Sequence, residues 1–202
     1  MNKSIQAVIA AAMAALPLMQ VSAAKVTHQV QSGDSMWKIA VKYEVGLSEI
    51  IAANSHITNP ELIYPGQIIT IPTTDSSVRS YEREVINRVN EIRAQNGLKV
   101  LTEDWELSRV ARIKSQDMKD NNYFSHTSPV YGSPFQMMKS FGISYRAAGE
   151  NIAKGQSTPQ AVVNAWMNSS GHRANILNSS YTHIGVGYVA SGKYWTQMFI
   201  SK

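Results

Sequence analysis

The spacing of apolar residues divides the chain into two parts. In the first part, a short alternating stretch (27–30) precedes two segments with helical spacing (37–43 and 47–54), and a β-branched run (68–71) follows the Pro65-Gly66 turn signal. This order predicts a small β-α-α-β unit over residues 26–72. Its two end strands would pair antiparallel, with both helices covering one face.

The second part, residues 81–202, combines helical periodicity with strand-like runs. An amphipathic helix is expected over 81–95, ended by Asn96-Gly97. Three further helices are expected beside capping signals: after Asp104, from Ser133-Pro134 and from Thr158-Pro159. Strands are expected over 184–189 and 194–200, joined by a turn at Ser191-Gly192. Helices around a small antiparallel sheet indicate an α+β layered domain.

Between the two parts, residues 73–80 form a polar stretch rich in Ser and Thr. It shows no apolar periodicity and contains no proline. We therefore predict a flexible linker of eight residues.

The first 24 residues have the pattern of a secretory signal peptide. Lys3 precedes an apolar run over 5–19, and Val21-Ser22-Ala23 and Ser22-Ala23-Ala24 both fit a small-x-small cleavage site. The alternative is an uncleaved anchor, but the run is shorter than the ~20 apolar residues that a bilayer span requires. We expect a secreted, extracellular protein with no stable membrane insertion after cleavage.

The composition of the chain excludes several kinds of site. The 202 residues contain no cysteine, which excludes disulfides, thiolate metal sites and a cysteine nucleophile. The formal net charge of +5 favours attraction to anionic wall polymers, although it identifies no partner. We expect no nucleic-acid partner.

The first part closely resembles a LysM module. The similarity is carried by residues from His28 to Ala40, Tyr43, Asn54, the stretch from Leu62 to Gln67, and Ile71-Pro72. The resemblance implies binding of N-acetylglucosamine-containing glycans such as peptidoglycan. It places the sugar in a groove between two loops, formed by Gly33, Asp34, Ser35 and Met36 on one side and by Asn59, Pro60, Glu61, Leu62 and Ile63 on the other.

Some of these positions also have a purely structural interpretation. Asp34 can cap the helix that follows it. Helical spacing favours Trp37 and Ile39 as core residues rather than as a platform for sugar.

Three polar residues stand out in the second part: His126, Glu150 and His172. Two imidazoles and a carboxylate can hold Zn²⁺ with an open position, or can act as acid and base. Their gaps of 24 and 22 residues match no local metal motif. Structural histidines with satisfied hydrogen bonds are therefore the alternative interpretation.

The segments around these residues resemble the CAP superfamily of cysteine-rich secretory, antigen 5 and pathogenesis-related 1 proteins. The specific motifs are Gly149-Glu150-Asn151-Ile152 and the run from Gly171 to Leu177. The resemblance implies an α-β-α sandwich over 81–202 with a central cleft. Many members present two histidines and two acidic residues there, and some bind zinc.

His126, Glu150 and His172 match three of these four positions. The family's other acid falls between the first histidine and the Gly-Glu-Asn motif, but residues 127–149 contain no Asp or Glu, and Gln136 stands in that region. Glutamine supplies no charge, so any zinc should be bound weakly.

Five further residues are assigned lesser roles. Gln197 and Tyr131 are expected near the cleft, His183 in a surface or packing role, and Arg173 and Asn175 in the loop that holds His172.

Two functions remain open from the sequence. The first is a cell-wall-associated protein that LysM attaches to peptidoglycan and whose CAP cleft binds an unidentified ligand. The alternative is a metal-assisted hydrolase of wall or extracellular material, although no Ser or Thr sits in a recognisable nucleophile elbow.

Overall fold

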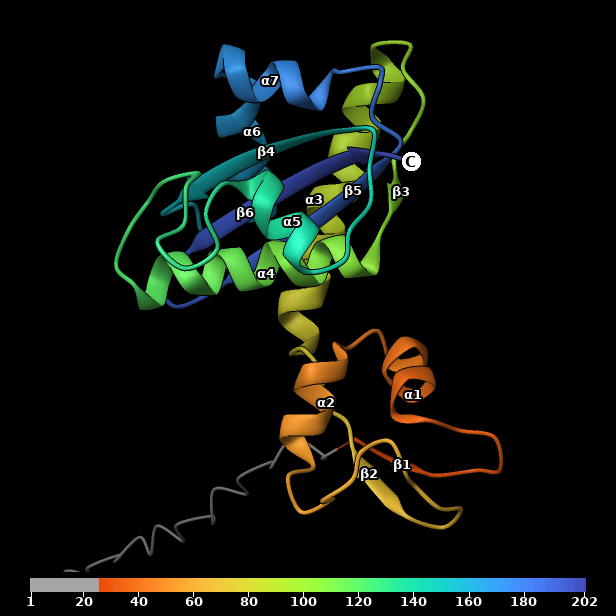
Figure 1. Ribbon diagram of the computed structural model, residues 1–202. Coiled ribbons are helices and arrows are strands. Elements are labelled where there is room, and N and C mark those ends of the chain that lie inside the picture. Colours follow the sequence, from red (N-terminus) through yellow and green to blue (C-terminus); the bar gives the residue numbers. More distant parts are fainter. Residues whose placement is uncertain (1–25) are drawn as a thin grey trace, which may run out of the picture.

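The computed structural model describes residues 26–202, and the predicted signal peptide at 1–24 lies outside the described residues. Figure 1 shows a small N-terminal unit and a larger layered unit, with helix α3 (Ser76–Gln95) leading from their boundary into the larger one. Within residues 26–202, no helix has the length and apolar character needed to cross a bilayer.

The small unit has the predicted β-α-α-β order. Strand β1 (Thr27–Gln29) is followed by α1 (Met36–Tyr43), α2 (Leu47–Ala53) and β2 (Ile68–Thr70). The two strands pair antiparallel, with His28 opposite Ile69. The unit has an apolar core of its own, made of Val30, Met36, Ile39, Ala40, Val45, Ile50, Ile69 and Ile71.

Two expectations at the start of α1 are wrong. Ser35, rather than Asp34, is the N-cap, because its hydroxyl accepts a hydrogen bond from Lys38 N. Ile39 faces the core, whereas Trp37 lies on the solvent side with 61% of its surface exposed.

The predicted flexible linker is shorter than expected. Asp75 caps α3 by accepting a hydrogen bond from Ser77 N at 2.7 Å, so residues 76–80 are helical. The apolar face of α3 extends back to Val78, which packs against the core of the larger unit. Only a few residues thus connect β2 to α3.

The larger unit contains a four-stranded sheet in the order β3-β5-β6-β4. Its strands are β3 (Thr102–Glu103), β4 (Ala147–Lys154), β5 (His183–Val189) and β6 (Tyr194–Ser201). The short β3 runs parallel to β5, which departs from the expected antiparallel sheet, and the other pairs are antiparallel. Neither β3 nor β4 was predicted.

Helices cover both faces of this sheet (Figure 1). Helices α3, α6 (Pro159–Met167) and α7 (Ser170–Ile176) lie on one side, while α4 (Trp105–Asp120) and α5 (Pro134–Ser140) lie on the other. The expected α-β-α sandwich is therefore confirmed. The caps Asp104, Ser133 and Thr158 begin their helices as predicted.

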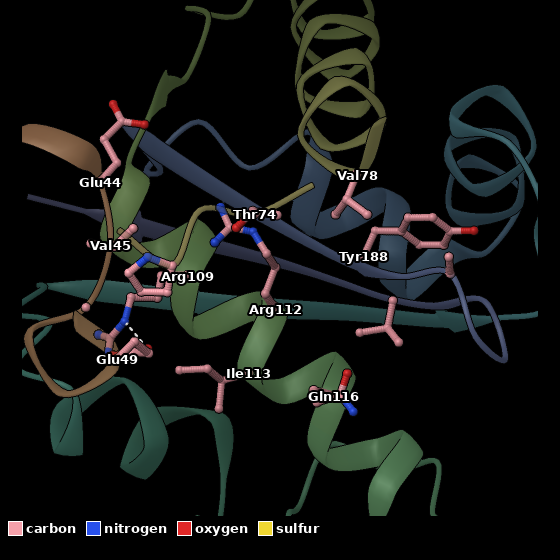
Figure 2. Close-up of a pocket in the computed structure, with 14 residues that line it drawn as sticks. Glu44, Val45, Glu49, Thr74, Val78, Arg109, Arg112, Ile113, Gln116 and Tyr188 are labelled. Carbon is pink, nitrogen blue, oxygen red and sulfur yellow. Dashed lines mark hydrogen bonds and ion pairs between the residues drawn. The ribbon is translucent and has the colours of Figure 1, made fainter. Parts of the chain in front are cut away.

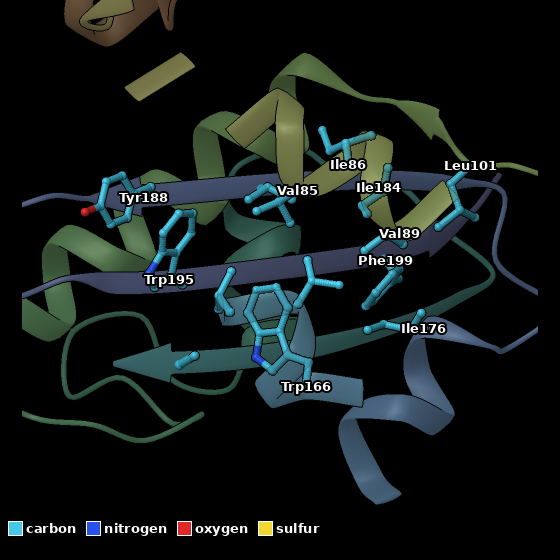
Figure 3. Packing of buried hydrophobic residues seen from close by; sticks show 14 of the residues in the cluster. Val85, Ile86, Val89, Leu101, Trp166, Ile176, Ile184, Tyr188, Trp195 and Phe199 are labelled. Carbon is cyan, nitrogen blue, oxygen red and sulfur yellow. The ribbon is translucent and has the colours of Figure 1, made fainter. Parts of the chain in front are cut away.

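The main core lies between the sheet and helices α3 and α6 (Figure 3). Trp166 and Trp195 are its largest buried side chains, and their indole N–H groups donate to the main-chain carbonyls of Ile152 and Gln156. On the opposite face, α4 packs directly onto β5 because Gly185 and Gly187 present no side chain. This close packing positions the second half of α4 beneath the polar site described below.

Candidate ligand-binding sites

His126 and Glu150 form a hydrogen-bonded pair at the edge of the larger unit. Nδ1 of His126 lies 2.7 Å from Glu150 Oε1. The histidine side chain is 52% exposed, whereas that of Glu150 is 1% exposed. The buried carboxylate thus orients the ring through Nδ1 and leaves Nε2 for a ligand. An imidazole held in this way can donate or accept a proton at Nε2.

Burial controls the protonation of this site. It raises the pKa of Glu150 above the usual range, although the bond to His126 and the charge of Lys114 act in the opposite direction. Burial also lowers the pKa of His172, and the neighbouring His126 lowers it further. The lowered pKa of His172 favours its neutral imidazole near the pair of His126 and Glu150.

A fully buried lysine, Lys114 of α4, supports the pair from below. Its Nζ donates to the main-chain oxygen of His126 at 3.0 Å and to the hydroxyl of Tyr123 at 2.9 Å. Asp117, one turn further along α4, accepts hydrogen bonds from the hydroxyls of Tyr123 and Ser128. These two charged residues fix both ends of the loop that carries His126. Sequence reasoning missed them, because charged residues on a helix usually face solvent.

Two asparagines connect helix α7 to β4 through hydrogen bonds. Asn151 donates to the main-chain oxygen of His172 at 3.1 Å and to Gln197 Oε1 at 2.9 Å. Asn175 donates to the main-chain oxygen of Glu150 at 3.2 Å and to Asn151 Oδ1 at 2.9 Å. Hydrogen bonds therefore join the two motifs that resemble the CAP superfamily. Asn175 helps to hold the segment that contains His172, as expected.

The described residues do not assemble a preformed zinc site. Among residues 26–202, no group of three His, Asp or Glu side chains is placed to hold a metal ion. Oε1 of Glu150 is occupied by His126, while its Oε2 is enclosed and has no partner in the part of the chain that the structure describes. In this arrangement His126 and Glu150 interact through a hydrogen bond.

The structure also shows the surroundings of Gln136, Tyr131 and His183. Gln136 is exposed, and its Oε1 accepts a hydrogen bond from Ser133 N in a capping box, so this side chain serves the start of α5. Tyr131 packs against Phe141 at 5.6 Å between ring centroids. His183 lies 2.7 Å from the hydroxyl of Thr182 at the start of β5, in a local contact.

In the small unit, a groove of about 450 Å³ lies along the connection between α2 and β2. Asn59 and Leu62, two of the residues predicted to bind glycan, line it, and Leu62 is 51% exposed. The groove is also lined by His56 and Tyr64, which the sequence analysis did not single out. Around the same loop, Pro60 and Ile63 are half-buried and Glu61 is exposed.

The other predicted glycan loop, residues 33–36, does not line this groove. The side chain of Met36 is buried in the core of the small unit, so only its backbone could reach a glycan. Asp34 Oδ2 lies 2.8 Å from His28 Nε2 and accepts a hydrogen bond from Gln31 N at 2.8 Å. Asp34 therefore shapes the loop, which leaves Gly33 exposed and Ser35 at the helix start.

The two units meet through ion pairs. Arg109 of α4 makes a two-pronged pair with Glu49 of α2, from Nε to Oε1 at 2.7 Å and from Nη2 to Oε2 at 2.8 Å. Arg79 reaches Glu44 at 2.6 Å. An open pocket of about 400 Å³ lies beside these pairs. Figure 2 shows residues that line it, with Arg112 of α4 among them.

Comparisons with known proteins agree with both units. The model of the cysteine-rich secretory protein family, CAP, matches residues 86–199, and the LysM domain model matches residues 28–72. YkwD, an uncharacterized protein of Bacillus subtilis (strain 168), is 65% identical over 133 residues, which is 66% of this chain and 52% of YkwD. The chain thus spans about half the length of the curated relatives it matches.

Two further likenesses are to a solved structure and to a second protein of Bacillus subtilis. The crystal structure of an extracellular protein with an SCP domain from Bacillus anthracis str. Ames is 36% identical, with a TM-score of 0.60, over 68% of this chain and 47% of that chain. SpoIVD-associated factor A of Bacillus subtilis (strain 168) is 48% identical over 52 residues, which is 26% of this chain and 13% of that protein. The arrangement of a LysM domain followed by a CAP domain is therefore confirmed.

Proposed function

Since this chain belongs to the cysteine-rich secretory protein (CAP) family and carries a LysM domain before its CAP domain, we propose that it is a secreted, cell-wall-associated protein. Its LysM domain binds peptidoglycan. Its CAP domain presents the pair His126 and Glu150 to a ligand of the wall.

The observation that carries this proposal is the LysM match over residues 28–72. LysM domains bind N-acetylglucosamine-containing glycans such as peptidoglycan. In this chain the domain has a core of its own and an exposed groove that includes Asn59 and Leu62. The positive net charge of the sequence favours the anionic polymers of a cell wall.

In the CAP domain, the chemistry supports recognition of a polar ligand. The outward Nε2 of His126 and the neutral imidazole of His172 offer hydrogen bonds that a carbohydrate or peptide can complete. A metal-assisted hydrolase remains the alternative function. The pair of His126 and Glu150 favours its acid–base part, whereas the metal part lacks a ligand set among the described residues.

Sedimentation with insoluble peptidoglycan tests the LysM assignment. Residues 26–202 should sediment with the wall, and a truncation to residues 74–202, which retains the cap and all of α3, should remain in solution. Leu62→Asp should weaken sedimentation of the full chain. The control Val130→Asp changes a similarly exposed residue of the CAP domain and should have no effect.

The same incubation distinguishes binding from cleavage. Soluble wall fragments released over time, and absent with His126→Ala, would favour the hydrolase. Equal sedimentation of the truncated and full chains would reject LysM as the wall-binding part.

A further inference from the structure

A second groove, of about 270 Å³, crosses the boundary between the LysM and CAP domains. The LysM side contributes Trp37 and Val41 of α1 and Leu47 at the start of α2. The CAP side contributes Trp105 at the start of α4 and Phe141 after α5. Two tryptophans from different domains therefore line one surface depression.

The apolar side chains of this groove are exposed on the LysM side, whereas Trp105 and Phe141 on the CAP side are half-buried. Trp37 is 61% exposed, and Val41 and Leu47 are each 39% exposed. Large apolar side chains gathered in one exposed depression commonly mark a binding site. The buried Trp166 donates its indole N–H to a main-chain oxygen, whereas Trp37 and Trp105 make no side-chain hydrogen bond to any part of the chain within residues 26–202.

The wall of the groove is held rigidly and carries little net charge. Arg109 stacks over the ring of Phe141, at 5.3 Å from the centroid, while its guanidinium is neutralised by the two-pronged pair with Glu49. The exposed Glu106 is the remaining acidic group in the lining. A neutral ligand with both apolar faces and hydroxyl groups therefore fits better than an anion.

A pyranose ring has this character, because its faces present C–H groups and its edge presents hydroxyls. An indole ring offers a flat apolar face and one N–H donor, and so it can satisfy both. Trp37 directly follows loop 33–36, which the LysM resemblance associates with glycan. The groove shares no lining residue with the one that includes Asn59 and Leu62, so it would hold a separate sugar.

We propose that the groove between Trp37 and Trp105 is an additional glycan subsite, which holds a further sugar of an N-acetylglucosamine-containing strand bound by the LysM domain. This inference rests on the proposed function. It predicts that the CAP domain takes part in glycan binding, so that affinity increases with strand length.

Calorimetry on residues 26–202 with N-acetylglucosamine oligomers of two and of five sugars tests the subsite. Trp37→Ala and Trp105→Ala should each weaken binding of the longer oligomer about tenfold, the equivalent of about 1.4 kcal/mol. Binding of the shorter oligomer should change little with Trp105→Ala. Trp105→Tyr keeps an aromatic face and should retain most of the affinity. Phe124→Ala removes an aromatic ring that is 50% exposed elsewhere on the CAP domain, and should have no effect.

A separate variant distinguishes stacking from domain orientation. Glu49→Gln breaks the ion pair with Arg109 but keeps both rings, and it should leave the length dependence intact. If Glu49→Gln reproduced the effect of Trp105→Ala, the loss would come from altered domain packing, and the subsite would be rejected.

The remaining outcomes are also decisive. Binding of both oligomers that is unchanged in the tryptophan variants would overturn the subsite and leave the LysM assignment intact. Association of the chain with itself that Trp37→Ala abolishes, together with unchanged sugar binding, would make the groove a protein interface and would also overturn it. Failure of the unaltered chain to bind either oligomer or peptidoglycan would reject the proposed function itself.

Discussion

The buried carboxyl group of Glu82 should make the stability of the CAP domain depend on pH. Glu82 lies on α3 and is only 3% exposed. Both of its oxygens lie 2.9 Å from Arg112 Nε, and Oε1 accepts a hydrogen bond from Tyr188 N at 3.0 Å. Burial raises the pKa of Glu82 from 4.5 to about 7, while Arg112 and Arg79 oppose that rise.

The sign of the effect follows from proton uptake. Between pH 4.5 and pH 7 the folded protein binds a proton at Glu82 that the unfolded chain releases, so the free energy of unfolding decreases as the pH rises through this window. A rise of about 2.5 in pKa corresponds to about 3 kcal/mol at 1.36 kcal/mol for each pKa unit. The full loss should be reached above pH 7 to 8.

Urea denaturation of wild type and Glu82→Gln at pH 5 and pH 8 measures this loss. Glutamine does not titrate, so the free energy of unfolding of Glu82→Gln relative to wild type should increase by about 3 kcal/mol between the two pH values. Glu84→Gln on the same helix removes a carboxylate that is 45% exposed, and it serves as the control for the loss of a charge that is not buried. If the wild-type and Glu82→Gln stabilities changed in parallel with pH, the reasoning would be refuted.

Two other substitutions test how α4 supports the candidate site. Lys114→Met should lower the free energy of unfolding by about 3 kcal/mol in urea denaturation, because it removes the positive charge near the buried Glu150 and Asp117 and leaves the main-chain oxygen of His126 without its donor. Lys119→Met, at a side chain that is 35% exposed, is the control and should change little. Gly187→Ala should destabilise by about 1–3 kcal/mol in thermal unfolding, because its Cβ would lie 2.1 Å from a backbone atom of α4. Gly171→Ala meets no atom within 4 Å, and an equal loss there would contradict the packing argument.

The sequence predicted the elements whose signals are local. Asp104, Ser133 and Thr158 were recognised as helix caps because a short polar side chain stands directly before an apolar run, and each accepts a hydrogen bond from the main chain of its helix. Strands β5 and β6 were recognised from β-branched and aromatic runs. In these segments, propensity and tertiary packing favour the same structure.

Strand β4 could not be predicted in this way. Its sequence, Ala147 to Lys154, contains three alanines, a glycine and three polar residues, a composition with little preference for strand. Its conformation depends on the ladder with β6, in which Glu150 lies opposite Met198 and Asn151 opposite Gln197. Such long-range pairing leaves no periodic signal in the strand itself.

The sequence predicted the residues of the candidate site, but it did not predict the buried residues that hold them in place. The motifs identified His126, Glu150 and His172, and the structure brings the first two into direct contact. The supporting Lys114 and Asp117 were missed, because their partners lie on a loop that only the folded chain brings over α4. Helical periodicity predicts which face of a helix is buried, but it does not predict a charge that is buried and paired.

The polar groups around Glu150 are costly to bury, and this cost bears on what the site does. Apolar residues of similar volume are often at least as stabilising as a buried charged group with its partners. Lys114 and Asn151 are nevertheless fully buried, and each forms hydrogen bonds to a different segment that borders the site. A network that only stabilised the core would not need to converge on His126 and His172. These bonds hold the main-chain oxygens of His126 and His172, and they support the proposal that the two residues are positioned for a ligand.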